Sequence, residues 1–508
     1  MRHVKPASAL LLSLLSGCSL IPAYHRPALP VTNQYPVTTS TSGQPAADIG
    51  WEQFFKDPAL QKLIALSLAN NRDLRVSVLD VEEAQAQYRV DRASLFPTIE
   101  GNAYQDVTRT PANLSSSGNA VTAHEYSLGA QAVSWELDLF GKIRSKAESA
   151  RQTYLSDAQT AVSARIALVA EVASEYYAWQ ADRESLQIAQ ETAASAQKSL
   201  HLTALELSHG TTTAMDVAQA QSTYDTAKAD IAQYQRQVAQ DLDQLVLLAG
   251  APIPRTLLKQ MEDTDGLAAE PALPRVPAGL PSDLLTRRPD IRAAEHLLLA
   301  ANANIGAARA AFFPSISLTA SGGVASNSLS SLFDGGQGSW MFEPQITVPI
   351  FTAGANIANL DIAKIEKRIE IANYEKAIQS AFHDVSDALT ARQTYDDQVS
   401  AQTDLVAADS RYYQLADMRF KAGIDNYLNV LVAQDSLLSA RLTLVSLKLV
   451  QQQNEITLYK ALGGGWQAQS TPPVPTAAGT SANAAGKATS PAPKPVSASS
   501  KPIPLTAN

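Results

Sequence analysis

The chain has 508 residues and a formal net charge of −9, and charged residues make up 18% of it, less than the quarter that is usual in soluble proteins. The acidic balance argues against nucleic acid as a partner, because phosphate backbones attract basic surfaces. The single cysteine excludes a disulfide within the chain.

The first 17 residues have the pattern of a lipoprotein signal peptide. Arg2 and Lys5 precede an apolar run, and small residues stand directly before Cys18, which resembles a bacterial lipobox. We therefore expect Cys18 to be lipidated, the alternative being an ordinary leader that happens to contain a cysteine. Ser19 follows where an inner-membrane signal would have aspartate, which favours the outer membrane. Lipid chains anchor without spanning, and no later stretch has the roughly 20 uninterrupted apolar residues of a transmembrane helix.

Residues 18–56 are rich in Pro, Thr and Ser and predict a lipidated, extended arm. Asp57-Pro58 then reads as a helix cap with proline in the first turn. The helical pattern continues to residue 95, with a break near Asn70-Asn71. After Phe96-Pro97 the apolar period changes to two, which predicts a strand pair within residues 98–140, split by a polar loop.

Residues 141–209 predict one very long helix. Between Gly141 and Gly210 stand 68 residues without glycine or proline, enough for a helix of about 100 Å. A partner helix is expected over residues 211–249, ending at Gly250. Its apolar residues alternate by three and four, which is typical of antiparallel helices packed as a coiled coil.

The same order returns 213 residues later, after a proline-rich linker at 251–281. The second repeat, 282–465, is expected to hold a helix to Phe313 and a strand pair within 314–351. A long helix at 354–422 and a partner helix at 424–462 should follow. Residues 466–508, rich in Pro and Ala, cannot bury enough apolar surface to fold and predict a disordered tail.

The strands are amphipathic and about as long as a bilayer is thick. One face of the expected strands carries Val133, Trp135, Leu137, Leu139, Trp340, Phe342, Ile346 and Val348. The other carries Ser134, Glu136, Asp138, Glu343, Gln345 and Thr347. A membrane sheet must close, because open edges leave backbone groups unpaired in lipid.

The strands of one chain are too few to close, whereas three chains give about twelve. The expected fold is therefore mainly α with a small β part. It would be a trimeric 12-stranded transmembrane β-barrel continuous with a long α-helical barrel. A soluble β-sandwich is the alternative for the strands.

Several short motifs occur in order along this duplicated scaffold. They are Tyr24-His25-Arg26-Pro27, Trp51-x-x-Phe54-Phe55-x-Asp57-Pro58, Arg287-Arg288-Pro289-Asp290-Ile291-Arg292, Phe312-Phe313-Pro314-Ser315-Ile316 and Leu462-Gly463-Gly464-Gly465-Trp466. With them the chain resembles, from Cys18 to Trp466, the TolC-type outer-membrane factors, specifically the OprM-like (NodT-type) lipoproteins of tripartite RND efflux systems.

The resemblance implies a homotrimer in the outer membrane, lipid-anchored and barrel-inserted, with a periplasmic tunnel. It would dock onto a periplasmic adaptor (membrane fusion) protein and, through it, an inner-membrane RND-type transporter. Drugs or other small molecules would pass through passively, without catalysis and without a cofactor.

The turns at Gly210 and Gly423 should form the periplasmic tips, with Thr211 and Ile424 contacting the adaptor. By resemblance, the second tip narrows the pore, and the residues concerned are Arg419, Phe420, Asp425, Leu428, Asn429 and Val432. An OprM-like protein has an apolar residue where Leu428 stands and an acid where Val432 stands, whereas a TolC-like protein has an acid at Asn429.

The acidic ring of the family is therefore missing at its usual place, and Asp425, Asp435 or Asp216 could replace it. Asp425 could instead cap a helix, and Asp435 could simply be solvated. Arg419, Lys421 and Asp425 could also link neighbouring helices at the tip.

Two other classes of protein are less consistent with the sequence. An enzyme would need a nucleophile elbow, a phosphate loop or metal-ligand spacing, and the seven histidines are scattered. A periplasmic coiled-coil adaptor or spacer lipoprotein would show one hairpin between β-rich halves, whereas this chain has two hairpins in tandem, each with its own strand pair.

Overall fold

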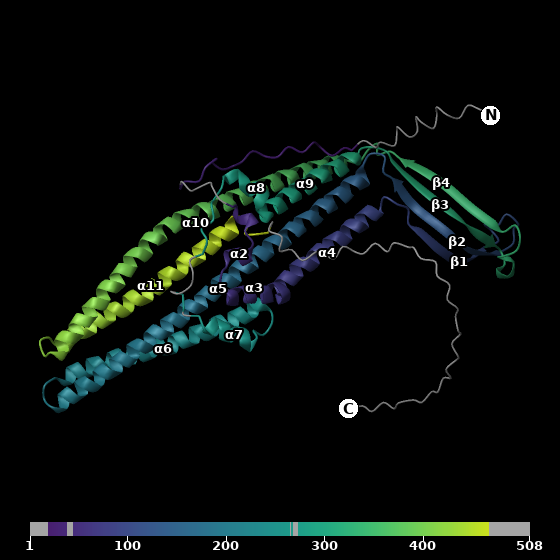
Figure 1. The fold of residues 1–508 in the computed structure, drawn as a ribbon. Helices are drawn as coiled ribbons and strands as arrows, with labels where there is room; N and C mark the ends of the chain where they lie inside the picture. Colours follow the sequence, from purple (N-terminus) through teal and green to yellow (C-terminus); the bar gives the residue numbers. More distant parts are fainter. Residues whose placement is uncertain (1–18, 38–43, 265, 268–272, 467–508) are drawn as a thin grey trace, which may run out of the picture. The chain divides into compact units, whose positions relative to one another are not determined.

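A computed structural model describes residues 19–37, 44–264, 266–267 and 273–466. The fold is mainly helical with one small sheet, as the sequence predicts (Figure 1). The signal peptide, Cys18 and the tail from residue 467 lie outside the described residues.

The helices and strands follow the duplicated order of the sequence. The first repeat contains α3 (Pro58–Asn70), α4 (Arg72–Ala93), β1 (Ile99–Thr110), β2 (Val121–Leu137), α5 (Lys142–Ser208) and α6 (Ala214–Ala249). The second contains α8 (Leu284–Arg287), α9 (Pro289–Ala310), β3 (Ser315–Ser326), β4 (Gly338–Thr347), α10 (Ala355–Lys421) and α11 (Tyr427–Ala461). Short elements lie beside them: η1 (Ala46–Asp48), α2 (Trp51–Phe54), α7 (Arg255–Glu262), η2 (Pro281–Asp283) and η3 (Leu329–Ser331).

The two long helices, α5 and α10, have 67 residues each. Their partner helices α6 and α11 begin three residues later than the sequence suggests, because residues after each turn glycine stay outside the helix. The helices before the strands also end earlier, at Ala93 and Ala310, since the chain turns before each Phe-Pro pair.

Helix α3 gives way to α4 at Asn70-Asn71, and side chains fix this break. The Asp57 carboxylate accepts the Ala59 N–H at 2.7 Å and the Asn71 side chain accepts the Leu74 N–H at 2.9 Å, so each helix has its own cap. Ser67 and Asn71 both donate to the Leu248 carbonyl, at 2.6 and 2.9 Å. The end of α6 is thereby attached to the α3–α4 junction.

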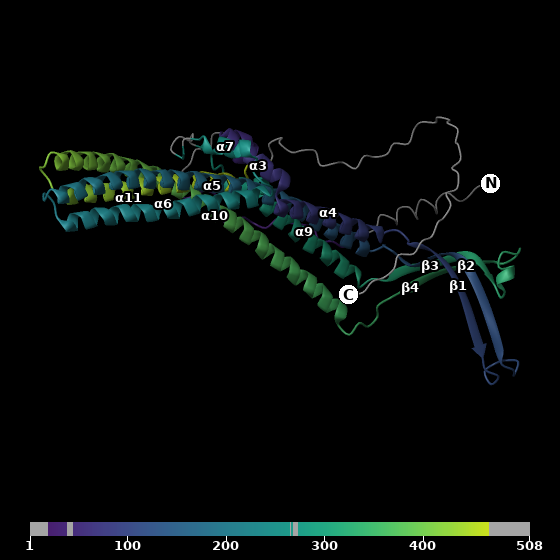
Figure 2. The same ribbon diagram turned by 90° about the horizontal axis from the view of Figure 1, so that it is seen from below.

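All four strands form one antiparallel sheet in the order β1-β2-β3-β4. The pairing of β2 with β3 joins the two repeats. Figures 1 and 2 show this sheet at one end of the long helices and the two helical turns at the other end.

The strand register gives the sheet one apolar and one polar face, because paired residues project to the same side. The apolar face carries Ile99, Leu128, Ala132, Trp135, Leu137, Leu318, Val324, Trp340, Phe342 and Ile346. The polar face carries Glu100, Asn102, Ser127, Gln131, Glu136, Ser317, Thr319, Glu343 and Gln345.

A bulge in β2 interrupts the simple alternation of apolar and polar side chains that the sequence suggests. Ala132 pairs with Ala320 and Trp135 with Leu318, so Val133 and Ser134 together form the irregular step, and Ser134 has φ of 53°. The extra residue changes the phase of the strand, and Ala132 and Trp135 therefore share the apolar face.

Three residues that we placed on strand faces lie beyond the strands. Leu139 and Val348 follow the last residues of β2 and β4. Asp138 accepts the N–H groups of Ile143 and Arg144 at 3.1 and 2.9 Å, and thus caps α5. Asp138, which follows the last residue of β2, therefore fixes the start of α5 relative to the end of this strand.

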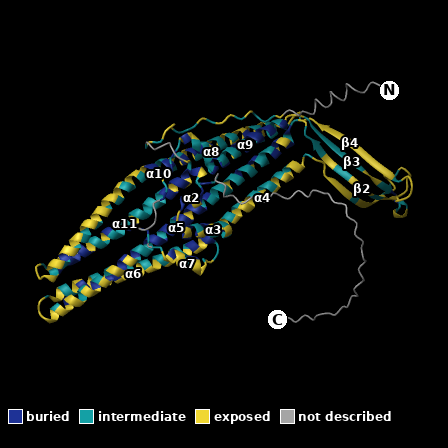
Figure 3. Cartoon of the chain, in the orientation of Figure 1, coloured by how far each residue is buried: buried dark blue, intermediate teal, exposed yellow. Residues whose placement is uncertain are grey.

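Four of the five short motifs contribute residues to one buried cluster, whereas Phe312 and Phe313 of the remaining motif are exposed. Phe54 stacks on Tyr459 with ring centroids 4.1 Å apart, and the Asp57 carboxylate accepts a hydrogen bond from Tyr176. Arg288 forms ion pairs with Asp290 and Asp384 at 2.6 and 3.2 Å. Figure 3 shows this middle region as the most buried part of the helices.

Trp466, which the sequence groups with the tail, belongs to the same cluster. Its indole N–H donates to the Arg287 carbonyl at 2.5 Å, and Arg292 lies over its ring. Gly463 has φ of 92°, and a Cβ there would collide with the Arg287 backbone.

The N-terminal arm lies along α9. Arg26 donates two hydrogen bonds of 2.8 Å to Glu295, which also accepts the Tyr24 hydroxyl at 3.0 Å. Nearer the sheet, Asn302 and Arg309 donate to backbone carbonyls of the arm at 2.8 and 3.2 Å. The first motif therefore fastens the arm to the helices.

Among the described helices, α11 is long and apolar enough to cross a membrane by length and composition. Our expectation from apolar runs did not identify it. Several apolar residues of α11 pack within the chain, because the side chains of Leu431, Val445, Ile456 and Leu458 are buried.

Candidate functional site

Two helical turns of the same construction form one end of the structure. Gly210 and Gly423 have φ of 73° and 70°, a left-handed conformation that favours glycine. In each turn the residue after the glycine, Thr211 or Ile424, donates its N–H to a carbonyl of the preceding helix at 3.0 Å. This pattern ends a helix and reverses the chain within a few residues.

The two turns are held together by contacts between the hairpins. The Ser195 and Tyr413 hydroxyls lie 2.9 Å apart, joining α5 to α10. A small apolar cluster made of Ala220, Ala416, Tyr427, Val430, Leu431 and Ala433 joins α6, α10 and α11. Phe420 packs against this cluster, with its ring centroid 5.2 Å from that of Tyr427.

The charged residues of the second turn pair within one chain. Arg419 donates to the Asp425 carboxylate at 2.6 and 3.1 Å, and Lys421 donates to Asp417 at 2.7 Å. The hydrogen bonds from Arg419 lower the pKa of Asp425. Within the chain, Arg419, Lys421 and Asp425 each have a partner in their own hairpin, and a link from them to neighbouring helices stays a prediction.

Asp425 also does not cap α11. The capping position belongs to Asn426, whose side chain makes no capping hydrogen bond. Arg419 draws the Asp425 carboxylate back toward the end of α10 instead.

Asp216 caps α6. Its carboxylate accepts the Thr213 N–H at 3.0 Å and the hydroxyls of Thr213 and Thr212 at 2.6 and 2.9 Å. In return the Asp216 N–H donates to the Thr213 hydroxyl at 3.3 Å, which completes a capping box. These hydrogen bonds lower the pKa of Asp216.

The first turns of α11 expose a second set of the residues suggested by the sequence. Leu428 and Val432 have exposed fractions of 46% and 49%, and Asn429 and Asp435 are also exposed. Leu428, Val432 and Asp435 are spaced by four and three residues and so share one face of the helix. Of the three acids suggested for this end, Asp435 alone has no ion pair or capping role in the described part of the chain.

A carboxyl pair halfway along the first hairpin was not identified from the sequence as a site. The carboxyl groups of Asp182 of α5 and Asp241 of α6 lie close enough to influence each other's pKa. Burial and the neighbouring Asp182 raise the pKa of Asp241 to about 7. The sequence contains an indication of this pair, because Asp241 occupies a position of the coiled-coil pattern that is ordinarily apolar.

The sheet supplies the second functional feature. Within the described residues, β1 pairs only with β2, and β4 pairs only with β3. Two strand edges are thus left without partners in the chain, beside an apolar face that includes exposed Trp340, Phe342 and Ile346. Unpaired edges next to apolar surface are able to pair with strands of another chain.

Comparison with known proteins agrees with these features. The family model of outer membrane efflux proteins matches residues 63–251 and 280–464. TtgC of Pseudomonas putida, named a probable efflux pump outer membrane protein, is 50% identical over 463 residues, covering 90% of this chain and 94% of TtgC. SrpC of Pseudomonas putida, named a solvent efflux pump outer membrane protein, is 46% identical over 471 residues, which cover 91% of this chain and 98% of SrpC.

A solved structure of the open state of the MtrE outer membrane channel of Neisseria gonorrhoeae is 39% identical. It superimposes with a TM-score of 0.81 over 88% of this chain and 99% of MtrE. Together with the repeats, the sheet and the paired hairpins, these matches show that the chain belongs to the outer membrane efflux protein family.

Proposed function

We propose that three copies of this chain form the outer-membrane exit channel of a tripartite efflux pump. The observation that carries the proposal is the four-stranded sheet with two unpartnered edges and opposite apolar and polar faces. Pairing β4 of one copy with β1 of the next closes three such sheets into a barrel of about twelve strands. The apolar face then meets lipid and the polar face lines the lumen.

The helices continue this barrel as a tunnel. In each repeat a strand leads directly into a long helix, β2 into α5 and β4 into α10. Helix faces with exposed apolar side chains, such as Val76 and Leu79 on α4 and Ile362 and Ile369 on α10, support contacts between copies. This arrangement favours a channel over an adaptor or spacer.

The partners of the channel are a periplasmic adaptor and, through it, an inner-membrane RND-type transporter. TtgC and SrpC are named as outer-membrane components of efflux pumps, which supports this assembly. The adaptor would contact the turns at Gly210, Thr211, Gly423 and Ile424. Ile424 has an exposed fraction of 63%, and an exposed apolar side chain at a turn suits a protein contact.

The pore would be narrowest where α11 begins. Leu428 and Val432 would form an apolar ring, with Asn429 beside them and Asp435 as the acid one turn farther from the tip. Asp425 and Asp216 would shape the turns rather than carry selectivity, because Arg419 and the threonines of the first turn hold them. Phe420 and Arg419 would support the ring from α10.

The native mass of the full chain extracted from outer membranes in mild detergent tests the assembly. A trimer that resists dissociation is expected, since backbone pairing between strands of different copies is costly to break in lipid. A monomer, or a protein released in soluble form when Cys18→Ser removes the lipid anchor, would contradict the barrel.

A further inference from the structure

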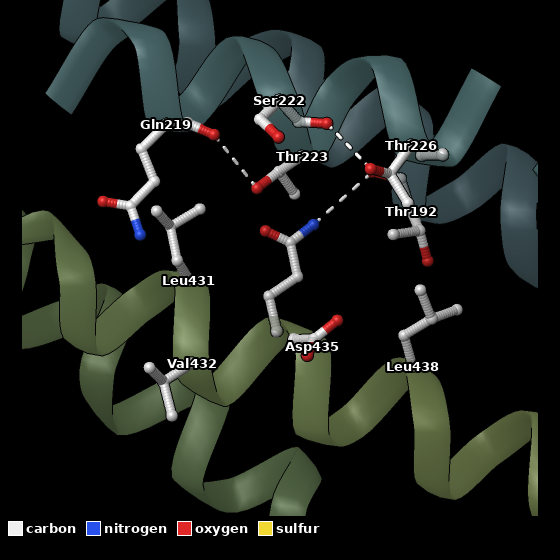
Figure 4. A pocket seen from close by; sticks show the side chains of 11 residues that line it. Thr192, Gln219, Ser222, Thr223, Thr226, Leu431, Val432, Asp435 and Leu438 are labelled. Atoms are coloured by element: carbon white, nitrogen blue, oxygen red, sulfur yellow. Dashed lines mark hydrogen bonds between the residues drawn. The ribbon is translucent and has the colours of Figure 1, made fainter. Parts of the chain in front are cut away.

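A groove lined by both polar and apolar side chains lies between α6 of the first hairpin and α11 of the second (Figure 4). Its volume is about 240 Å3. The lining residues that matter here are Thr192 of α5, Thr223 and Thr226 of α6, and Gln434 and Asp435 of α11.

The hydrogen-bond donors of these threonines are already used within their own helices. The Thr192 hydroxyl donates to the Ile188 carbonyl at 2.8 Å. Thr223 and Thr226 donate to the carbonyls of Gln219 and Ser222 at 3.3 and 2.9 Å, as Figure 4 shows. Their remaining capacity is as acceptors, because a hydroxyl has one donor and two lone pairs.

Gln434 contributes a further unused acceptor. Its side chain is only 6% exposed, and its amide N–H lies 3.5 Å from the Thr192 carbonyl. Its Oε1 atom is buried and has no hydrogen-bond partner in the described part of the chain. A buried acceptor without a partner costs free energy that a donating ligand would recover.

The groove also carries one net negative charge. The Asp435 carboxylate lines it, and no lysine or arginine does. Leu431 and Leu438 supply an apolar wall beside these acceptors. The complementary ligand therefore has several N–H donors, a positive charge and a short apolar tail.

We propose that this groove binds small primary ammonium compounds with a short alkyl or arylalkyl tail. The ammonium group would donate to Gln434 Oε1, to the Asp435 carboxylate and to a threonine oxygen of α6. Because its contacts come from both hairpins, the ligand would stabilise the hairpin arrangement seen here. The site lies directly beside Val432, so occupancy would act at the narrow end of the channel.

Isothermal titration calorimetry on the full chain in detergent, with phenethylammonium as the probe, tests the proposal. Wild type is expected to bind it, and Asp435→Asn should weaken binding by about tenfold or more, since a charge-assisted hydrogen bond is lost. Gln434→Leu should have a similar effect. Thr223→Val, at a partly exposed position of α6, serves as a second variant if Gln434→Leu fails to fold.

Controls separate the proposed contacts from general attraction to an acidic protein. Asp404→Asn removes an exposed carboxylate of α10 outside the groove and should leave binding unchanged. The neutral 2-phenylethanol and the trimethylated phenethylammonium, which lacks N–H donors, should not bind. Absence of binding to wild type, equal binding of the trimethylated probe, or full affinity in Asp435→Asn would each overturn the proposal. Because binding is measured without transport, such a result would leave the trimeric channel untouched.

Discussion

At the residue scale, the structure separates acids that shape the tips from the one that is free to face the pore. Asp216 is held by Thr212 and Thr213, and Asp425 by Arg419. Surface pairs of this kind contribute little to stability individually, but they fix where the charge lies. The selectivity of the narrow end should therefore depend on Val432 and Asp435, which share the exposed face of α11 with Leu428.

Introducing an acid at the apolar ring tests this assignment. Val432→Asp should raise the ratio of cation to anion permeability about fivefold, because a carboxylate from each copy would face a constriction of low dielectric constant. The measurement is the reversal potential in planar lipid bilayers under a salt gradient, together with single-channel conductance. Thr443→Asp is the matched control, since it adds the same charge on the same exposed face of α11, farther from the tip. If neither quantity changes in Val432→Asp, Val432 does not lie at the constriction.

At the element scale, the α5–α6 hairpin contains an acid pair where a coiled coil ordinarily has apolar residues. Burial favours the protonated form of Asp241, and the charges of the neighbouring Asp182 and Glu175 favour it further. In the folded hairpin Asp241 keeps its proton up to about pH 7, whereas in the unfolded chain it loses the proton near its ordinary, lower pKa. The contribution of this carboxyl pair to the stability of the hairpin is therefore greatest in acid and is lost as the pH rises from about 4 to about 7.

Asp241→Asn should remove this pH dependence. At neutral pH the variant is expected to be more stable by about 1 kcal/mol, a value reduced for the partial solvent exposure of the pair. That corresponds to an apparent Tm roughly 1 °C higher, because the Tm shift per kcal/mol becomes smaller as the cooperative unit becomes larger. Thermal unfolding followed by circular dichroism across this pH range is the measurement. Asp243→Asn, an exposed neighbour on α6, should keep the wild-type pH profile. A wild-type Tm that does not change with pH would contradict the raised pKa of Asp241.

At the scale of the whole molecule, assembly depends on close contact between the two repeats in the sheet. β2 and β3 approach each other at Gly129 and Gly323, where a Cβ on Gly129 would lie 2.7 Å from the Gly322 carbonyl oxygen. Only glycine allows this approach. This contact joins the strand pairs of the two repeats. A side chain that prevents β2 from pairing with β3 would therefore disrupt every sheet of the barrel.

Gly129→Val should therefore reduce the fraction of detergent-resistant trimer several-fold. Gly101→Val is the matched control, because the nearest atom to a Cβ at Gly101 is the Gly129 carbonyl oxygen at 4.0 Å. Trimer content is read by native mass measurement of membrane extracts. Equal assembly of both variants would show that β2 and β3 can separate without loss of the barrel.

Local patterns in the sequence were sufficient for the mainly helical fold with its small sheet. Runs without glycine or proline allow α5 and α10 to extend without interruption, and the change of period after each Phe-Pro pair marks β1 and β3. These features depend on backbone preferences and on burial within single elements, which neighbouring residues specify. The family resemblance also followed from motifs read in order.

Only the tertiary structure decided what individual polar residues do. The sequence left Asp216, Asp425 and Asp435 equivalent, because the role of a carboxylate depends on which donors the turns bring within hydrogen-bond distance. The bulge at Ser134, the Asp138 cap and the groove at Gln434 likewise depend on contacts between elements. Periodicity determines which residues share a face of one element, whereas charge pairing and unsatisfied acceptors arise only once separate elements are packed together.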